Sequence, residues 1–396
     1  MCTFAEHLTI KQIVLNTELL YERLYHWYET DHRILPWRET TDPYRIWISE
    51  IILQQTRVAQ GMEYYLRFVD RFPNVRTLAE ASEDEVLRYW QGLGYYSRAR
   101  NLHKAARQVV ATVGSVGGVA STSGQTQDKE AVVSEPTQDK IANVSDPTQD
   151  EIFKSLLSMP GVGEYTAGAI ASFAFNLPYP ALDGNVYRVL ARLYDCDIAF
   201  DTGAGKQHFH MIANQLLDRK NPRLFNSAIM EFGALYCTPQ SPDCSLCPLQ
   251  AFCMAYVHHT VNILPVRKPR TALRDRYLNY TIYLSPDHRT LLHQRTENDI
   301  WKHLYEFVLV ESDQLLPVVP YAEMAQKDGN SSAVASVDIT HILSHQRLHA
   351  RFHIETVPAL PNITGCIAVP FASLDDYALS RLTLKALEML FGRTGA

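Results

Sequence analysis

The chain has 396 residues, of which 46% are hydrophobic, and a formal net charge of -6 at pH 7. This length and apolar content are typical of a globular protein with two or three domains. The sequence contains no hydrophobic segment long enough to span a bilayer and no visible signal peptide. We therefore exclude an integral membrane protein and expect a cytoplasmic one.

The negative charge argues against a nucleic-acid partner, because phosphate binding requires a basic surface. However, residues 112–150 hold six acidic residues and two lysines, so the rest of the chain has 35 basic and 37 acidic residues. A chain so close to neutrality can still carry a basic face. The net charge alone therefore excludes no partner.

Residues 17–110 are predicted to form successive amphipathic helices. Pro43 after Asp42 suits a helix start, with the acid as cap and proline at the first helical position. Ser82 with Glu85 predicts a capping box. Within this region Glu50 is a lone acid in the apolar run WISEIIL. Such an acid is most often exposed on an amphipathic helix, but burial would raise its pKa and keep it protonated for acid catalysis.

A low-complexity segment follows at residues 113–150. The motif TQD recurs there every eleven residues, at 126, 137 and 148, among Gly, Ser, Ala and Val. An eleven-residue period can indicate a helical repeat. Two intervening prolines and the sparse apolar content instead favour a disordered insertion without a role in chemistry.

Helical patterning resumes at 152, and two short motifs follow in chain order. MPGVG at 159–163 is typical of a hairpin between two helices, in which backbone amides hold a phosphate without reading sequence. LDGN contains Asp183, which by pattern alone is a turn or a helix cap. By pattern alone, Asn185 is the cap of the next helix.

Four cysteines lie close together in CTPQSPDCSLCPLQAFC, at positions 237, 244, 247 and 253. Thiolates this close usually share a metal centre, and they suit zinc or an iron-sulfur cluster. Zinc ribbons usually have two C-x2-C pairs separated by a longer gap, whereas this spacing is C-x6-C-x2-C-x5-C. The compact spacing favours one iron-sulfur cluster over zinc and over disulfides, and a thiolate-held cluster fits a reducing compartment.

Beyond a basic, proline-containing linker at 266–276, the period of the sequence changes. YLNYTIYL, EFVLV and RFHIETV predict strands, and a helix is expected near 374–391. The segment HILSH at 341–345 is then a loop at the end of a strand. The nearby His341, His349 and His353 raise the alternative of a metal site, but their spacing is irregular and no carboxylate accompanies them.

The cysteine spacing resembles that of the endonuclease III and MutY family of DNA repair glycosylases. Five further segments resemble its adenine DNA glycosylase branch: LPWR at 35–38, PYRIWISEIILQQTRV at 43–58, GLGYYSRARNLHKAA at 92–106, MPGVGEYTAGAIASFAF at 159–175 and ALDGNVYRVLARL at 181–193. The C-terminal strands resemble the Nudix-like domain of the same branch, without the Glu-rich metal box of Nudix hydrolases. The loop between Cys237 and Cys244 departs from the family, because it has no basic residue.

The resemblance implies a mainly α helix-hairpin-helix region with an iron-sulfur loop, followed by an α+β Nudix-like domain. The expected boundaries are 1–265 for the first region, interrupted by the insertion 113–150, then the linker 266–276 and the second domain at 277–396. It implies one [4Fe-4S] cluster held by Cys237, Cys244, Cys247 and Cys253. The implied partner is double-stranded DNA with adenine opposite 8-oxoguanine or guanine, bound by a monomer that is cytoplasmic and nucleoid-associated.

The resemblance also implies roles for individual residues. Glu50 is the general acid, and Asp183 stabilises the oxocarbenium-like sugar or captures it covalently. Tyr165 lies beside the reacting sugar, where lyase relatives have a lysine that forms an imine, and Asn185 orients the sugar or water. Contacts to DNA and to the flipped base are expected from a set of motif residues: Trp37, Arg38, Gln54, Gln55, Thr56, Leu93, Tyr95, Gly161, Gly163, Glu231, Ser344 and His345.

In this set, the GLGYY segment would be the wedge beside the orphaned base, and Ser344 with His345 would read 8-oxoguanine. Core packing is the alternative for Trp37. Two other functions remain at this stage. An endonuclease III-like lyase is opposed by Tyr165, and a catalytically idle iron-sulfur DNA-binding protein is opposed by the joint presence of Glu50 and Asp183.

Overall fold

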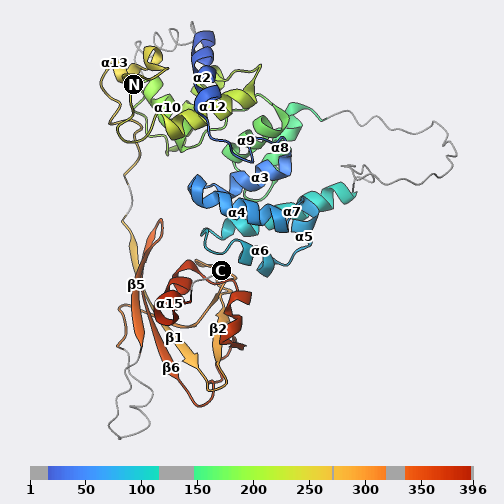
Figure 1. The fold of residues 1–396 in the computed structure, drawn as a ribbon, viewed down its shortest axis with the longest axis vertical. Coiled ribbons are helices and arrows are strands. Elements are labelled where there is room, and N and C mark those ends of the chain that lie inside the picture. Colours follow the sequence, from blue (N-terminus) through green and yellow to red (C-terminus); the bar gives the residue numbers. More distant parts are fainter. Residues whose placement is uncertain (1–16, 116–146, 270–271, 318–334, 394–396) are drawn as a thin grey trace, which may run out of the picture. The chain divides into compact units, whose positions relative to one another are not determined.

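The computed structural model describes residues 17–115, 147–269, 272–317 and 335–393. The chain forms two compact units (Figure 1). The first unit comprises residues 1–50 and 104–266, and the second comprises 51–103 and 267–396. Most of the insertion expected at 113–150 lies outside the described residues. The domain boundaries expected from the sequence stay a prediction.

The first unit is helical. Its elements, two of which continue into the second unit, are α2 (Thr17–Asp31), α3 (Pro43–Ile52), the later part of α7 (Ser97–Ser115), α8 (Gln149–Ser158), α9 (Glu164–Phe175), α10 (Gly184–Leu193), α11 (Gly203–Leu216), α12 (Pro222–Leu235), the 3-10 helix η1 (Gln250–Phe252) and α13 (Met254–Val257). Helix α12 packs against α2, α9 and α10. The ring of Trp27 meets the ring of Phe232 edge-on, with centroids 5.0 Å apart, in the core between α2 and α12.

Two glycines let helices approach the chain around Asp183. A Cβ atom at Gly168 of α9 would lie 2.4 Å from the carbonyl oxygen of Pro180. A Cβ atom at Gly233 of α12 would lie 2.8 Å from both the Cβ and the carbonyl oxygen of Asn185. Real Cβ atoms do not tolerate such distances, so glycine is required for both approaches. As a result, α9 and α12 pack directly against the segment that leads into α10.

The second unit begins with helices α4 (Val58–Arg71), α5 (Val75–Glu80), α6 (Glu83–Tyr89) and the first part of α7. Phe68 of α4 packs edge-on against Trp90 at the end of α6, with ring centroids 5.8 Å apart. Ser82 caps α6 by accepting a hydrogen bond from the Glu85 amide at 3.2 Å. The Glu85 side chain forms an ion pair with Arg71. Of the predicted capping box, the bond accepted by the Ser82 side chain is therefore present, whereas the Glu85 side chain pairs with Arg71 instead of the cap amide.

The C-terminal part of the second unit contains two sheets. The four-stranded sheet has the order β4-β1-β6-β5, formed by β4 (Val308–Ser312), β1 (Arg274–Leu284), β6 (Gln346–Thr356) and β5 (Ser336–Ile342). The three-stranded sheet has the order β3-β2-β7, formed by β3 (Tyr305–Glu306), β2 (Arg289–Gln294) and β7 (Cys366–Pro370). Strands β1 and β6 are parallel and place Tyr280 opposite Phe352, whose rings stack at 4.4 Å. The 3-10 helix η2 (Phe371–Asp376) and helix α15 (Arg381–Phe391) complete the unit.

Several local predictions agree with the structure. Helix α3 begins at Pro43, and the Tyr44 amide donates to the Asp42 side chain at 2.9 Å, as expected for a cap. The three predicted strands are found as β1, β4 and β6, whereas the helix expected near 374–391 is divided into η2 and α15. Helix α8 begins earlier than predicted, because Thr148 of the last TQD motif forms a capping box with Glu151. Within the described residues, none of the helices has the length and apolar character needed to cross a bilayer.

Candidate active site and iron-sulfur loop

Glu50 is buried, with 2% of its surface exposed, on the inner face of α3. The Tyr165 hydroxyl donates a hydrogen bond of 2.5 Å to one of its carboxylate oxygens. The Arg38 guanidinium donates to the other at 3.2 Å, and its other face lies 3.8 Å from the Phe173 ring centroid. The exposed surface glutamate that the pattern alone favoured is therefore wrong. The buried carboxyl has a charged and a neutral donor in fixed positions.

Asp183 is the N-cap of α10. One carboxylate oxygen accepts from the backbone amides of Asn185 at 2.9 Å and Val186 at 2.8 Å, and the other accepts from the Asn185 side chain at 2.7 Å. Burial raises the pKa of Asp183 above its ordinary value, and the nearby Glu50 raises it further, while these hydrogen bonds oppose the shift. The cap predicted from LDGN and the predicted site residue are thus the same carboxylate.

Tyr165 lies in the first turn of α9, where its hydroxyl bonds to Glu50 and is close enough to Asp183 to feel its charge. Burial raises the pKa of its hydroxyl well above 10, and the charges of Glu50 and Asp183 act in the same direction. The hydroxyl therefore remains protonated and serves as a hydrogen-bond donor near neutral pH. Because a phenol has no amine, it cannot form an imine with a sugar aldehyde.

A hydrogen-bonded path runs from Asp183 to the cysteine-rich loop. The Asn185 side chain donates to Asp183 and accepts from Arg188 at 2.9 Å. Arg188 also donates to the carbonyl oxygens of Gly233 at 2.5 Å and Cys237 at 2.7 Å. Sequence reasoning missed Arg188, which lies on α10 one turn after Asn185. Its position within YRVLARL was the only signal, and that pattern is also typical of a surface arginine.

Glu231 pairs with Arg33 in the structure. The Arg33 guanidinium donates to both Glu231 oxygens, at 2.6 and 2.8 Å, and its backbone amide donates at 3.1 Å. Sequence reasoning singled out Glu231 but not Arg33, which lies two residues before LPWR. Trp37 is 1% exposed and lines a cavity of about 170 Å³ together with Arg38 and Phe173. Its two readings, pocket wall and core residue, are therefore compatible.

The MPGVG segment forms a tight hairpin between α8 and α9. Gly161 has a φ of +79°, in the left-handed region that favours glycine, and Gly163 is the N-cap of α9. Gly163 and Tyr165 line a cavity of about 340 Å³, whose wall also contains Lys206 and His210 from α11. The amides at the start of α9 and the Lys206 side chain would favour an anion in this space, although Glu164 also lines it.

The four cysteines of the 237–253 loop are free thiols of intermediate burial. Burial raises the pKa of Cys247 to about 12 and that of Cys253 to about 11, and the nearby thiolates add to both shifts. Four thiolates this close repel one another, and bound iron would offset that repulsion. Within the described part of the chain, no three His, Cys, Asp or Glu side chains converge as ligands of a single metal ion. The donor set fits an iron-sulfur cluster, which distributes its thiolates over several irons.

Arg192 of α10 holds the cysteine loop through side-chain hydrogen bonds. It is 2% exposed and donates to Cys237 Sγ at 3.3 Å and to the carbonyl oxygen of Thr238 at 2.7 Å. Its Nε also donates to the carbonyl oxygens of Val261 and Leu264, at 3.1 and 3.2 Å. Sequence reasoning did not identify it, because a buried arginine in an apolar helix is defined only by its distant acceptors.

The remaining predicted residues lie in the second unit. Arg98 joins two of their segments: it donates to the carbonyl oxygen of Gln54 at 2.6 Å and to that of Gly94 at 3.3 Å. Burial lowers the pKa of Arg98 to about 10. Gln55 has a φ of +58°, in the segment that contains Gln54 and Thr56. Arg98 was also missed, because its acceptors are backbone atoms.

The two predicted wedge residues of the GLGYY segment at 92–96 differ in exposure. Tyr95 is 48% exposed with a φ of +50°, whereas Leu93 is 8% exposed. Tyr95 is thus available to an incoming surface, and Leu93 would have to leave its packing to enter DNA. A wedge role for either residue stays a prediction.

Ser344 and His345 lie in the turn between β5 and β6, where both are exposed. The Ser344 hydroxyl is 3.1 Å from His345 Nδ1. The alternative of a histidine metal site receives no support from the other histidines. His349 bonds to Asp275 at 2.8 Å and stacks on Tyr277.

Comparison with known protein families gives three matches along the chain. Residues 48–203 match the HhH-GPD superfamily of base excision DNA repair proteins. Residues 237–253 match the iron-sulfur binding domain of endonuclease III, and residues 279–389 match the NUDIX domain. These matches confirm the expected fold class and the expected [4Fe-4S] cluster.

The chain also resembles characterised proteins over most of its length. It is 32% identical over 282 residues to the adenine DNA glycosylase of Buchnera aphidicola subsp. Schizaphis graminum, covering 71% of this chain and 72% of that protein. It is 29% identical to that of Buchnera aphidicola subsp. Baizongia pistaciae, covering 87% and 86%. The match to the Mus musculus adenine DNA glycosylase, at 39% identity, covers 58% of this chain and 40% of that protein. Among solved structures, a thermostable thymine-DNA glycosylase aligns with a TM-score of 0.48 and 24% identity, covering 61% of this chain and 97% of that one.

Proposed function

The chain belongs to the adenine DNA glycosylase family, and from this premise we propose that it removes undamaged adenine mispaired with 8-oxoguanine and, less efficiently, with guanine. It is a base excision repair glycosylase that acts on DNA and carries a [4Fe-4S] cluster. The mispair preference and the residue roles are the proposed part. The thiolate-held cluster also leads us to propose a cytoplasmic location, and we propose a monomer.

One observation carries the proposal: a buried Glu50 and a capping Asp183 lie near one Tyr165 hydroxyl. Excision requires the nucleotide to be flipped out of the stack into a pocket, because the N-glycosidic bond is otherwise inaccessible. In the proposed reaction Glu50, in its protonated form, donates its proton to a ring nitrogen of adenine. The leaving base is then neutral, and the bond to the sugar breaks more easily.

Asp183 is the proposed partner of the sugar cation. Three hydrogen bonds from Asn185 and Val186 hold its carboxylate in one orientation before substrate binds. A preorganised negative charge stabilises developing positive charge without a reorganisation cost, as in glycosidases. Water then completes the hydrolysis and leaves an abasic site.

The cluster has a separate role in this proposal. Cys237, Cys244, Cys247 and Cys253 hold it, and when bound it supplies a rigid cross-link, together with redox capacity that glycosidic hydrolysis does not use. Hydrolysis transfers no electrons, so the reaction depends on the two carboxylates. The cluster instead fixes the loop whose Cys237 carbonyl accepts from Arg188.

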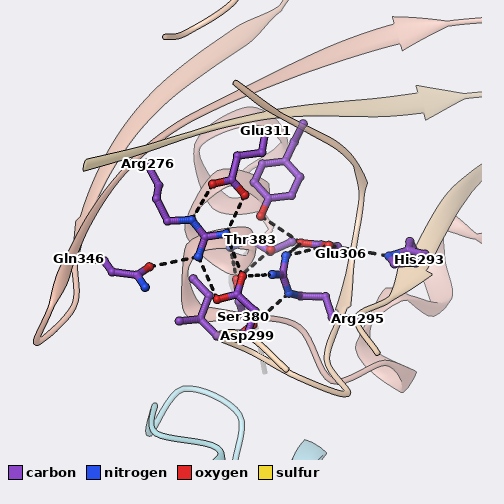
Figure 2. A network of polar contacts seen from close by, with 11 residues as sticks. Arg276, His293, Arg295, Asp299, Glu306, Glu311, Gln346, Ser380 and Thr383 are labelled. Atoms are coloured by element: carbon purple, nitrogen blue, oxygen red, sulfur yellow. Dashed lines mark hydrogen bonds and ion pairs between the residues drawn. The ribbon is translucent and has the colours of Figure 1, made fainter. Parts of the chain in front are cut away.

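Lesion reading is assigned to the turn between β5 and β6. Opposite adenine, 8-oxoguanine in its syn form turns its 2-amino group into the major groove, where an undamaged pair has no such donor. The exposed Ser344 and His345 carry the acceptor and aromatic groups for this contact. A pyrophosphatase activity is not proposed for this domain. The carboxylates Asp299, Glu306 and Glu311 beside its cavity of about 410 Å³ are already in ion pairs with arginines (Figure 2).

The test is single-turnover excision from duplexes with adenine opposite 8-oxoguanine, guanine, cytosine or thymine. Glu50→Gln keeps the shape and one acceptor, which can face Tyr165 while the amide nitrogen faces Arg38, but it has no acidic proton to donate. We therefore expect excision to fall about 10²–10⁴-fold with duplex affinity retained. Glu29→Gln is the matched control, because Glu29 is exposed on α2 of the same unit. Substantial excision by the Glu50 variant would remove this residue from the mechanism.

A further inference from the structure

An ionic network built around two buried arginines crosses the C-terminal part of the second unit (Figure 2). Arg276 of β1 is paired with Asp299 at 2.8 Å and with Glu311 at 2.7 Å. Asp299 also accepts from Arg295 at 2.8 Å, and Arg295 is paired with Glu306 at 2.8 Å. Both arginines are less than 10% exposed, and each makes several charge-assisted bonds. Moving either arginine is costly, because its buried charge would lose two carboxylate partners.

One end of the network holds the turn that carries Ser344 and His345. Arg276 donates to the Gln346 side chain at 3.1 Å, and Gln346 directly follows His345. The Leu343 amide donates to the Gln346 carbonyl oxygen at 2.8 Å and closes the turn. The His345 carbonyl oxygen accepts from the Arg274 amide at 3.2 Å. The proposed lesion-reading turn is therefore attached to the network through Gln346 and to the start of β1 through His345.

The other end holds the segment 295–304. The Arg295 amide donates to the Leu304 carbonyl oxygen at 2.9 Å, and the His303 amide donates to the Arg295 carbonyl oxygen at 2.6 Å. Trp301 and His303 have φ values of +58° and +68°, which non-glycine residues rarely adopt. Such strained conformations persist only where the surroundings impose them, and they concentrate at functional segments.

This segment contacts the helices of the same unit. His303 is hydrogen-bonded to the Glu83 carboxylate at the start of α6. Arg100 of α7 donates to the Lys302 carbonyl oxygen at 2.7 Å. Two charged side chains from the helical part therefore hold the backbone and the imidazole of two consecutive residues.

The third contact involves the GLGYY segment itself. Tyr96 is 3% exposed, and its hydroxyl donates to the Leu379 carbonyl oxygen at 3.1 Å, just before α15. The same hydroxyl accepts from the Gly92 amide at 3.4 Å. Gly92 has a φ of +95°, and a Cβ atom there would lie 2.2 Å from the Tyr64 hydroxyl. The GLGYY segment is therefore fixed at Gly92 and Tyr96, while Tyr95 between them is exposed.

We propose that these contacts couple lesion reading to base flipping, with Tyr96 as the positioning residue that ties the wedge segment to the C-terminal domain. The proposal rests on the proposed function, because it needs the β5–β6 turn to read 8-oxoguanine and Tyr95 to enter the stack. When the turn engages the lesion, the ionic network and the 295–304 segment keep the Glu83 contact in register. Tyr305, which directly follows that segment and pairs with Leu379, does the same for the Tyr96 acceptor. Tyr95 is then held in the orientation that replaces the flipped adenine. Without the Tyr96 hydroxyl, lesion contact no longer favours flipping.

A double-mutant cycle tests this coupling, because interaction energies between sites appear only as non-additivity. The parent, Tyr96→Phe, Ser344→Ala/His345→Ala and the combination of all three substitutions are compared. The readout is the ratio of single-turnover excision rates for adenine opposite 8-oxoguanine and opposite guanine. We expect Tyr96→Phe to lower this ratio about 3- to 10-fold, the usual effect of one lost hydrogen bond. The combined variant should show little further loss beyond Ser344→Ala/His345→Ala.

Two further variants make the test specific. Glu83→Gln weakens the partly exposed His303 contact without creating a cavity, and it should shift the ratio in the same direction. Tyr89→Phe is the control, because it removes a tyrosine hydroxyl from the same helical part, where the ring packs on Phe72. Fluorescence of 2-aminopurine in place of the target adenine reports flipping directly. It should show less lesion-dependent flipping in Tyr96→Phe and no change in Tyr89→Phe.

The outcomes separate the two proposals. If Ser344→Ala/His345→Ala keeps the full ratio, lesion reading by this turn is refuted, and the coupling that depends on it falls as well. If that variant loses the ratio while Tyr96→Phe keeps it, or slows both duplexes equally, the lesion assignment stands and the coupling is refuted. Losses that multiply in the combined variant also refute the coupling.

Discussion

Asp183 both caps α10 and, in the proposed reaction, faces the sugar cation, and a matched pair of substitutions separates these roles. Asp183→Ser retains an oxygen that accepts from the first-turn amides, whereas Asp183→Ala does not. Both variants lose the carboxylate and the 2.7 Å contact with the Asn185 side chain. Asparagine is a poorer choice, because its amide would place a donor against the donating Asn185 nitrogen. The pair therefore differs only in the cap.

We expect the alanine variant to be less stable than the serine variant by about 1 kcal/mol, within a range of about 0.5–2 kcal/mol. That difference corresponds to about 2–4 °C in Tm for a domain of 150–250 residues. Excision should fall in both variants by about 10²–10³-fold, as for removal of one preorganised electrostatic group. Urea or thermal unfolding gives the first quantity, and single-turnover excision gives the second.

The stability that Asp183 contributes to the folded state should depend on pH with a defined sign. Because burial raises the pKa of Asp183, the folded state holds the proton more tightly than the unfolded chain, whose pKa is near 3.8. The parent therefore loses stability relative to Asp183→Ser as the pH rises from about 3.8 to the raised folded-state pKa, and the loss is constant above it. Equal stability of the serine and alanine variants would refute the cap. Near-parental excision by either one would refute the role of Asp183 in the reaction.

Three further predictions concern Tyr165, Arg188 and the segment around Thr148. Borohydride should trap no covalent adduct with substrate DNA, because Tyr165 has no amine; efficient trapping would overturn the monofunctional assignment. Arg188→Met should lower the free energy of unfolding by about 1.5–3 kcal/mol for each charge-assisted bond that water does not replace. It should also lower both the visible absorption of the cluster per protein and the excision rate. Unchanged absorption would show that the Cys237 contact is dispensable. Replacing residues 118–145 with a short Gly-Ser linker should leave the excision rate within about twofold of the parent, which corresponds to less than about 0.5 kcal/mol. Thr148→Ala should instead lower the free energy of unfolding by about 1 kcal/mol, because it removes the cap of α8.

Local signals explain what the sequence predicted well. Caps at Asp42 and Asp183 act over two or three residues, so the side chain and the amide that it satisfies are visible in one short string. Strand periodicity is similarly local, and β1, β4 and β6 lie where it indicated. The early start of α8 was missed for a physical reason. TQDE was interpreted as one repeat among three, although Thr followed three residues later by Glu is itself a helix-start signal.

Partners far apart in sequence were not predictable in this way. Arg33 and Glu231 are 198 positions apart, and Tyr96 and Leu379 are 283 apart, so no periodicity relates them. Arginine makes this limit severe, because its acceptors are often backbone carbonyls, which every residue has. Arg98, Arg188 and Arg192 all donate to such carbonyls. Motif resemblance identified Glu50 and its partner Arg38, but not the Arg33 that pairs with Glu231.

This division between local and long-range signals also bears on how the site operates. Glu50 is the last residue of α3 that belongs to the first unit, and Gln54 belongs to the second unit. Only the last turn of α3 and the residue after it therefore separate Glu50 from Gln54. Arg98 bonds to the carbonyl oxygens of both Gln54 and Gly94. A helix is stiff over one turn, because each residue is bonded to the next turn. Within α3, the position of Glu50 is therefore fixed by the helix itself and by its contacts with Arg38 and Tyr165.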